Sequence, residues 1–183
     1  MKIAVFCSAV DNLPSHWQQG AEAVGRWIGS HGDQMIYGGV DAGLMAIASR
    51  ACKAAGGTVV GIVPGRRAAQ ASPINDVRVP TSDLNDRKGV MQLLSDVYVV
   101  LPGGAGTFDE FATCFTYISF TANHHKRIII YNPDGLYDHL LAQLQVFIDR
   151  GLMKASNLDF IDIANNTDDV IAALDRFRSS YNK

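Results

Sequence analysis

The stretch DVYVVLPGGAGTFDE, residues 96–110, passes from an unbroken apolar run through a glycine-rich turn into an acidic segment. An apolar run that does not alternate with polar residues is typical of a parallel strand covered on both faces. Glycines mark the end of such a strand, and Thr107 is a residue type that commonly begins a helix. The stretch therefore predicts a strand, a tight turn and a helix, the repeating unit of an α/β fold.

The same alternation extends along the whole chain of 183 residues. Strands are predicted at residues 2–9, 35–39, 58–64, 77–80, 96–102 and 127–132, with a weaker one at 160–164. Amphipathic helices are predicted at residues 15–30, 43–55, 83–94, 107–121, 137–149 and 167–181. This order predicts an α/β, doubly wound, mostly parallel sheet of about six to seven strands with helices on both faces, a Rossmann-like fold. One domain over residues 1–183 is expected, with a mobile surface loop at 64–75.

The composition indicates a globular protein without a polyanionic partner. Hydrophobic residues make up 48% of the chain and charged residues 19%, and the formal net charge is −2. The paired basic residues Arg66-Arg67 and Lys126-Arg127 are too sparse for a phosphate-tracking stripe, and we expect them to be solvated. Neither a nucleic acid nor a membrane surface is therefore an expected partner.

The cysteines and histidines do not indicate a metal site. Cys7, Cys52 and Cys114 lie far apart in the sequence and match no metal-ligand spacing, which suits buried thiols in a reducing compartment. His124 and His125 precede a predicted strand and are expected to be solvated. No apolar run is long enough to span a membrane, and the first residues are typical of a strand and not of a cleavable leader. A cytoplasmic protein is expected.

Ligands of doubly wound sheets bind beyond the carboxyl ends of the strands. The turn after the first predicted strand, residues 7–12, contains no glycine, which disfavours a dinucleotide fingerprint, although Ser8 could border a pocket. The turn at residues 103–107 has no lysine before its threonine, which disfavours a Walker loop for nucleoside triphosphates. A site for a single phosphate group remains compatible with this turn.

The glycine-rich turn has the chemistry of such a site. Gly103, Gly104 and Gly106 can adopt positive φ and turn their N–H groups inward as an anion-binding nest. Thr107 would open a helix whose free N–H groups and dipole attract an anion. An ordinary strand-to-helix turn also favours glycine, so the residues alone leave phosphate binding and a purely structural turn open.

The acids after the turn have two interpretations. Thr107 and Glu110 fit a capping box, in which the threonine caps the helix and the glutamate returns the hydrogen bond. Carboxylates would repel a phosphate at the same helix end unless they pointed past it, toward a sugar. A carboxylate beside a ribose could stabilise the positive charge that develops as a glycosidic bond breaks. The sequence leaves both interpretations open.

A second charged cluster lies at residues 82–88. Asp83 and Arg87 are spaced for an i,i+4 ion pair on a helix surface. Gly89 follows inside the helical pattern, where glycine costs about 1 kcal/mol relative to alanine, and it indicates close approach by a ligand or another backbone. Arg87 could therefore either pair with Asp83 or face a site.

Three segments together resemble the LONELY GUY (LOG) family of cytokinin riboside 5′-monophosphate phosphoribohydrolases. The nine-residue motif PGGxGTxxE is intact at residues 102–110. Asp86-Arg87-Lys88 matches an upstream acid–Arg–Lys segment of the family, and Met91 follows it as in the family. The segment GGVDAGLMA, residues 38–46, is similar to GGGxxGLMG. The nine-residue motif is specific, and the other two segments support it.

The resemblance implies a hydrolase that splits the N-glycosidic bond of a purine riboside 5′-monophosphate, giving free base and ribose 5-phosphate without a metal or other cofactor. It implies that Arg87 and Glu110 are the catalytic residues. It also implies a homodimer with active sites near the subunit interface. Substrate-binding residues are expected at Gly103, Gly104, Gly106, Thr107, Lys88, Met91, Gly39, Gly43 and Ser8.

Some positions depart from the family pattern or are variable in it. Val40 and Ala46 stand where the family has glycines, which could narrow the pocket and change the preferred base. AMP is therefore the cautious choice of substrate, beside a cytokinin-type riboside. Asp109 falls at a variable position of the long motif and is a possible supporting group.

Two alternatives to the hydrolase follow from the same resemblance. The superfamily includes molybdenum-cofactor carrier proteins, which present a phosphate to a glycine-rich loop without catalysis, but the presence of both Arg87 and Glu110 favours the hydrolase. The label lysine decarboxylase is also attached to the family. Pyridoxal chemistry needs a Schiff-base lysine, and nothing in the sequence marks Lys53, Lys88 or Lys126 for that role.

Overall fold

Seven parallel strands form the centre of the fold in the computed structural model, which describes residues 1–121 and 125–181. In chain order they are β1 (Lys2–Phe6), β2 (Gln34–Tyr37), β3 (Thr58–Pro64), β4 (Val77–Thr81), β5 (Val97–Val100), β6 (Arg127–Tyr131) and β7 (Ile161–Ala164). Their order in the sheet is β4-β3-β2-β1-β5-β6-β7, and every neighbouring pair is parallel. The predicted α/β fold with six to seven strands is confirmed.

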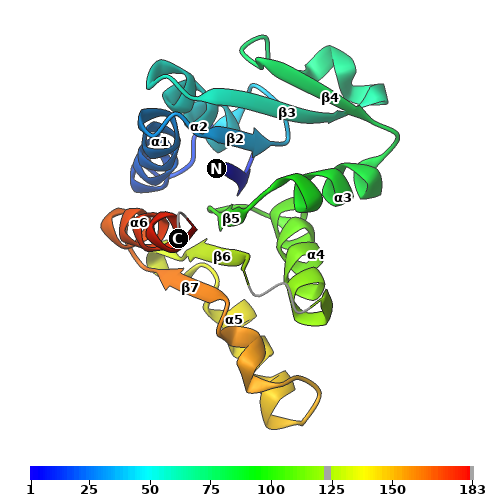
Figure 1. Cartoon of the computed structure of the whole chain (residues 1–183), viewed down its shortest axis with the longest axis vertical. Helices are drawn as coiled ribbons and strands as arrows, with labels where there is room; N and C mark the ends of the chain where they lie inside the picture. The colour runs from blue at the N-terminus through cyan, green and yellow to red at the C-terminus, as the bar shows by residue number, and fades with distance from the viewer. Residues whose placement is uncertain (122–124, 182–183) are drawn as a thin grey trace.

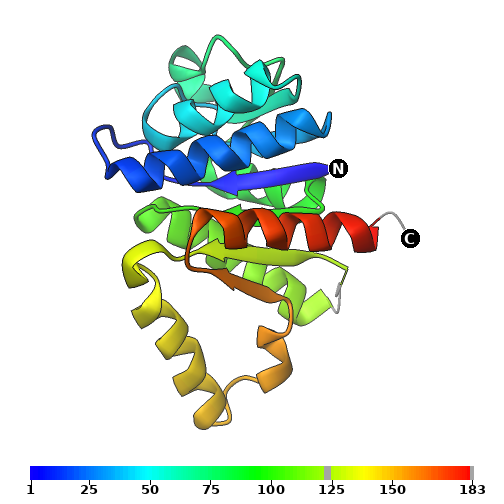
Figure 2. The same cartoon turned by 90° about the vertical axis from the view of Figure 1, so that its left-hand side faces the viewer.

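The described residues also form six α-helices that cover both faces of the sheet (Figure 1). They are α1 (Ser15–Ser30), α2 (Gly43–Ala54), α3 (Leu84–Leu94), α4 (Ala105–Thr121), α5 (Asp138–Asp149) and α6 (Thr167–Tyr181). Helices α1, α2 and α6 cover one face, and Figure 2 shows α1 and α6 running in front of the strands. Helices α3, α4 and α5 cover the other face. Short 3₁₀ segments follow β3 (η1, Gly65–Gln70), β6 (η2, Pro133–Gly135) and α5 (η3, Ala155–Leu158).

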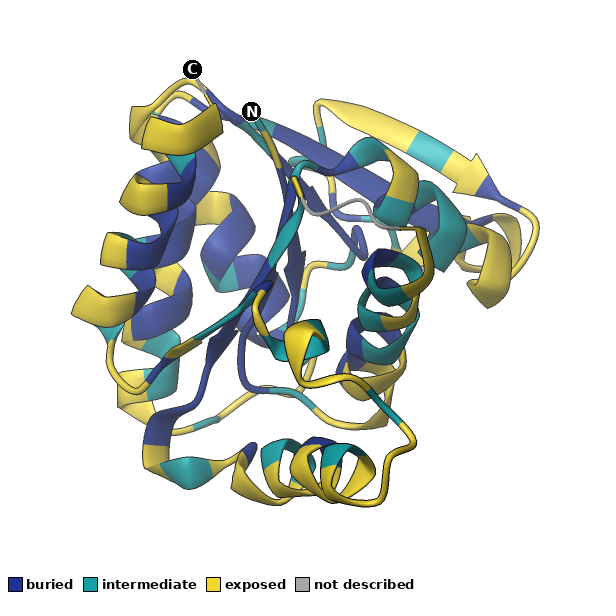
Figure 3. Cartoon of the chain, turned by 60° about the horizontal axis from the view of Figure 1, so that its bottom comes forward, coloured by how far each residue is buried: buried dark blue, intermediate teal, exposed yellow. Residues whose placement is uncertain are grey.

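Strands β1, β2, β3, β5 and β6 each contribute side chains to both of two apolar cores, one on each face of the sheet. In β1, Ile3 and Val5 pack in the core beneath α1, α2 and α6, whereas Ala4 and Phe6 pack in the core beneath the other helices. Successive strand residues point to opposite faces, so a strand covered on both sides must be apolar throughout. Figure 3 shows the result, with buried residues in the sheet and on the inner faces of the helices.

The segment at residues 64–75 is attached to the fold at more points than a mobile surface loop would be. Its residues 65–70 are exposed, as expected, but they form η1. Ala71 forms an antiparallel bridge with Val40, and the Ser72 N–H donates to the Gly39 carbonyl at 2.7 Å. The expectation of a mobile excursion did not include these attachments to the turn between β2 and α2.

The expectation that Lys126-Arg127 would be solvated is wrong. The Lys126 ammonium donates to the carbonyls of Gln92 at 2.9 Å and of Ser95 at 2.5 Å, and so covers the C-terminus of α3. Burial lowers the pKa of Lys126. Arg127 pairs with Asp162 at 2.7 Å. Both basic residues therefore have structural roles.

The burial of the three cysteines and the exposure of His125 match the prediction from the sequence. Cys7, Cys52 and Cys114 are buried free thiols, as expected. His125 is exposed, while His124 lies outside the described residues. Within residues 1–121 and 125–181, no three His, Cys, Asp or Glu side chains gather as a possible metal site. No helix in this part of the chain is long and apolar enough to cross a membrane.

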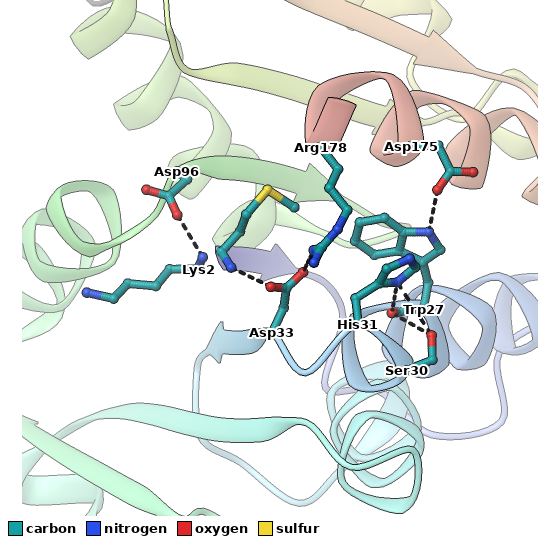
Figure 4. A network of polar contacts seen from close by, with 9 residues as sticks. Lys2, Trp27, Ser30, His31, Asp33, Asp96, Asp175 and Arg178 are labelled. Carbon is teal, nitrogen blue, oxygen red and sulfur yellow. Dashed lines mark hydrogen bonds and ion pairs between the residues drawn. The ribbon is translucent and has the colours of Figure 1, made fainter. Parts of the chain in front are cut away.

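A polar network joins the amino-terminal ends of β1 and β2 to α6 (Figure 4). Asp33, which is only 4% exposed, accepts hydrogen bonds from the terminal amine of Met1 and from the Arg178 guanidinium. The Trp27 indole N–H donates to Asp175 at 2.8 Å, and the Arg178 guanidinium lies 6.0 Å from the centre of the Trp27 ring. The network fixes α6 to the first two strands at their amino-terminal ends, on the opposite side of the sheet from the carboxyl ends of the strands.

We expect Asp33→Ala to lower the free energy of unfolding by about 3 kcal/mol, because it removes the buried partner of two cationic groups. Urea unfolding followed by circular dichroism measures this loss. Glu22→Ala is the matched control, since it breaks the exposed Glu22–Arg26 pair on α1 and should cost less than about 0.5 kcal/mol. Equal losses in the two variants would contradict a stabilising role for the network.

Candidate active site

A cavity of about 330 Å³ opens at the carboxyl ends of the central strands, where doubly wound sheets bind their ligands. It is lined by the turn after β1, by α2, η1 and α3, and by the turn and helix after β5. The lining residues are Cys7, Ser8, Ala9, Met45, Arg67, Leu84, Arg87, Lys88, Gly104, Gly106, Thr107, Asp109 and Glu110. The structure thus brings together most of the residues that the sequence indicates as a site.

The glycine-rich turn after β5 leaves open space at the start of α4. None of Gly103, Gly104 and Gly106 has a positive φ, so the expectation of a nest built on positive φ is wrong. A Cβ at Gly103 would lie 2.1 Å from the Thr107 hydroxyl oxygen, so packing requires glycine there. At Gly104 and Gly106, a Cβ would meet no heavy atom of the described residues within 4 Å. This open space adjoins the first turn of α4, whose free N–H groups favour an anion.

The capping-box interpretation of Thr107 and Glu110 is wrong. Helix α4 begins at Ala105, so Thr107 lies inside its first turn and is not the residue that precedes the helix. Glu110 is 4% exposed, and its carboxylate accepts a hydrogen bond from the Arg87 guanidinium. The glutamate therefore lies on the cavity wall and joins α4 to α3.

The expected surface pair between Asp83 and Arg87 does not form either. Asp83 caps α3 by accepting hydrogen bonds from the backbone N–H groups of Asn85 at 2.8 Å and of Asp86 at 2.9 Å. Arg87 lies one turn later, where its side chain is 12% exposed and pairs with Glu110. A Cβ at Gly38 would be 3.2 Å from the Arg87 Nη2 atom, so the missing side chain at Gly38 leaves room for the guanidinium.

Two ion pairs lie side by side between α3 and α4. Beside Arg87–Glu110, the Lys88 ammonium contacts both carboxylate oxygens of Asp109 at 2.7 Å. Burial raises the pKa of Glu110, and the charge of Arg87 and its hydrogen bond oppose this effect. The result is a desolvated carboxylate, held by one guanidinium, at the wall of a cavity that also borders the open first turn of α4. Such a group can accept a proton from water or stabilise positive charge.

Four of the expected substrate-binding residues lie outside the cavity lining, among them Gly103, which packs closely against Thr107. Met91 is buried in the core beneath α3. Gly39 has φ +75°, and a Cβ there would lie 2.4 Å from a methyl group of Val63. Gly43 has φ +52°, and a Cβ there would lie 2.4 Å from the Val10 carbonyl oxygen. The two glycines shape the turn between β2 and α2, which explains their place in the motif without direct contact to a ligand.

The two residues that replace family glycines lie away from the cavity. Val40 packs against the core and bridges to Ala71, and Ala46 is buried on α2; neither lines the cavity. They therefore do not narrow it directly. A Cβ at Gly89 would meet nothing within 4 Å among the described residues, so no other backbone in this part of the chain approaches it closely.

Several lining residues were missed by the sequence reasoning. Met45 lies in the segment at residues 38–46 and Leu84 lies within the charged cluster at residues 82–88, but neither was expected to line a site. Arg67 belongs to a basic pair that was expected to be solvated. Only the positions of Arg67 and Leu84, just beyond the ends of β3 and β4, could have indicated a site, by the rule that ligands bind at the carboxyl ends.

Comparison with known proteins shows which family this chain resembles. A family model described as "Possible lysine decarboxylase" matches residues 45–174. The probable cytokinin riboside 5′-monophosphate phosphoribohydrolase LOGL5 of Oryza sativa subsp. japonica is 31% identical over 96% of this chain and 72% of its own length. The cytokinin riboside 5′-monophosphate phosphoribohydrolase of Mycobacterium marinum is 31% identical over 93% of this chain and 91% of its own length.

A solved structure with the same fold is that of the molybdenum cofactor binding protein from Rippkaea orientalis. It is 25% identical, with a TM-score of 0.75 over 96% of this chain and 95% of its own. The phosphoribohydrolases match more closely in sequence, and the nine-residue motif from Pro102 to Glu110 is intact. The chain belongs to the LOG family, whose family model carries the decarboxylase description.

Proposed function

We propose that this chain hydrolyses the N-glycosidic bond of a purine riboside 5′-monophosphate, either AMP or a cytokinin-type riboside, to free base and ribose 5-phosphate. The observation that carries the proposal is the pairing of Arg87 with the buried carboxylate of Glu110, in a cavity that also contains the open glycine-rich turn. The names of the LOG relatives support it, because their substrates carry the same phosphate and glycosidic bond.

The phosphate anchors the substrate in this proposal. It binds at the start of α4, beside Gly104 and Gly106, where backbone N–H groups and the helix dipole favour negative charge. The phosphate does not react, so its binding energy serves to align the sugar with the carboxylate of Glu110.

The chemical step then breaks the bond between ribose C1′ and the base nitrogen, whose electron pair leaves with the base. Positive charge develops on C1′ and the ring oxygen, and the carboxylate of Glu110 stabilises it. A water molecule adds its oxygen to C1′ and gives a proton to Glu110. The departing base takes a proton from solvent and Glu110 returns its proton to solvent, so that the step consumes one water molecule in all. Arg87 holds the carboxylate in place through the guanidinium hydrogen bond.

A non-catalytic molybdenum-cofactor carrier is the second candidate, and the fold of the Rippkaea orientalis protein favours it. A carrier does not need a buried carboxylate beside the phosphate site, whereas glycosidic hydrolysis does. A pterin that remained bound through purification would favour the carrier.

The decarboxylase label receives no support from the lysines in question. Lys53 pairs with Asp76, Lys88 pairs with Asp109, and Lys126 caps α3. Of these, only Lys88 lines the cavity. The homodimer stays part of the proposal and rests on the family resemblance.

Incubation of the purified protein with AMP, and separately with its N6-isopentenyl analogue, tests the proposal. We expect free base and ribose 5-phosphate to be released in equal amounts, as measured by chromatography. The preferred substrate identifies the base. Binding of AMP without any release of base would contradict the hydrolase and favour a nucleotide-binding or carrier role.

A further inference from the structure

Arg67 is a cavity residue that belongs to none of the three family motifs. It lies on η1, directly after β3, and lines the same cavity as Arg87 and Glu110. Its neighbour Arg66 has the same charge and the same exposed 3₁₀ segment but does not line the cavity. The two arginines therefore share their charge and exposure but differ in whether they line the cavity.

The charges of the cavity leave Arg67 uncompensated. The lining contains three cationic side chains, of Arg67, Arg87 and Lys88, and two carboxylates, of Asp109 and Glu110. Arg87 pairs with Glu110, and Lys88 pairs with Asp109. The guanidinium of Arg67 makes no ion pair or side-chain hydrogen bond with the described residues. It is thus the one lining cation in this part of the chain that pairs with no carboxylate; the Arg87 Nε atom also lacks a hydrogen-bond partner, but its guanidinium is already paired with Glu110.

The sheet order places Arg67 far from the phosphate site. Strands β3 and β5 are separated by β2 and β1, which puts their ends about 14 Å apart at the usual strand spacing. The glycine-rich turn follows β5, whereas η1 follows β3. If a mononucleotide has its phosphate on the glycine-rich turn and its sugar beside Glu110, a base that extends toward the end of β3 would reach Arg67. Arg67 and Leu84 lie at that end of the cavity.

The segment that carries Arg67 is held in place on its C-terminal side. The Ala71–Val40 bridge and the 2.7 Å hydrogen bond from Ser72 to Gly39 attach it to the turn after β2. This attachment gives Gly39 an indirect role in the site, because its carbonyl helps to position η1. Arg67 therefore extends from a fixed turn, and a fixed turn lowers the cost of ordering a long side chain.

We propose that Arg67 binds the base of the nucleotide, which deepens the proposed function and rests on it. A guanidinium is flat, so it can stack on a purine ring, and it only donates, so it matches the acceptor nitrogens of the ring. Leu84 and Met45 line the same cavity and offer apolar contact to a ring. Arg67 is thereby a specificity residue, distinct from the groups that hold the phosphate.

Calorimetric binding of AMP and of ribose 5-phosphate tests this assignment, in protein that carries Glu110→Gln to prevent turnover. In that background, Arg67→Ala should raise the dissociation constant for AMP about tenfold and change that for ribose 5-phosphate, which has no base, by less than about twofold. Arg66→Ala is the matched control and should change neither constant by more than about twofold. Arg67→Lys keeps the charge but not the flat donor plane, so it should restore only part of the AMP affinity.

Other outcomes would contradict either the contact between Arg67 and the base or the proposed function. Equal weakening of AMP and ribose 5-phosphate by Arg67→Ala would assign Arg67 to the phosphate and overturn the base contact. Unchanged binding of both ligands, or full recovery with lysine, would also overturn it while leaving the hydrolase proposal intact. If the parent protein bound neither ligand, the proposed function would fail, and this inference with it.

Discussion

Glu110→Gln is expected to reduce base release from the preferred nucleotide by about 100- to 10,000-fold, the usual contribution of a positioned general base. Glutamine keeps the size of the side chain, and its carbonyl oxygen can still accept the hydrogen bond from Arg87. It cannot take a proton from water or balance the charge that develops at C1′. Single-turnover kinetics measures the loss, and calorimetry should show that the variant still binds AMP.

The pH dependence of the same reaction gives an independent test. Burial raises the pKa of Glu110 above the ordinary value of 4.5, and the carboxylate is the active form in the proposed step. Activity should therefore fall as the pH is lowered, at a pH above 4.5. The residual activity of Glu110→Gln should lack this decline, because glutamine does not titrate.

Asp109→Asn provides the matched control for Glu110→Gln. It makes the same change at the neighbouring residue, whose side chain is 55% exposed and already paired with Lys88. We expect it to reduce base release by less than about tenfold. If the two variants lost activity equally, the distinct role of the buried carboxylate would be contradicted.

The sheet was predictable from the sequence because its signal is local. The unbroken apolar runs of β1, β5 and β6 can only be satisfied by burial on both faces, and burial on both faces requires helices between parallel strands. The turn after β5 was also predictable as a candidate site from its three glycines, although Gly103 is needed for packing against Thr107.

The partners of the charged residues were not predictable in the same way. Asp83 and Arg87 are four residues apart on one helix, and sequence spacing alone favours their pairing. Asp83 is instead used as the cap of α3, and Arg87 finds Glu110 across the interface between α3 and α4. Which carboxylate Arg87 pairs with depends on how α3 and α4 pack against each other, and no local sequence pattern encodes this packing. Arg67 was missed for the same reason, since only the sheet order brings η1 to the cavity.

Arg87→Ala is expected to lower both base release and stability, and the loss of stability should depend on pH. Without Arg87, the buried Glu110 has lost the positive charge that opposes the rise in its pKa, so this pKa should rise further. A glutamate whose pKa is raised in the folded state stabilises the fold below its unfolded value, near 4.5, and this contribution is lost as the pH rises through the folded value. The variant should therefore be about 3–5 kcal/mol less stable than the parent at pH 8, and the difference should shrink toward pH 5.

Urea unfolding at a series of pH values measures this dependence, and two further variants separate charge from packing. Arg87→Ala combined with Glu110→Gln retains the space left by arginine but has no carboxylate to desolvate, so its stability relative to the parent should be higher at pH 8 than that of Arg87→Ala alone. Lys88→Ala removes the neighbouring cation, whose partner Asp109 remains hydrated, and should cost less than about 1 kcal/mol. A loss in Arg87→Ala that was the same at pH 5 and pH 8 would mean that packing, and not the charge of Glu110, makes Arg87 necessary.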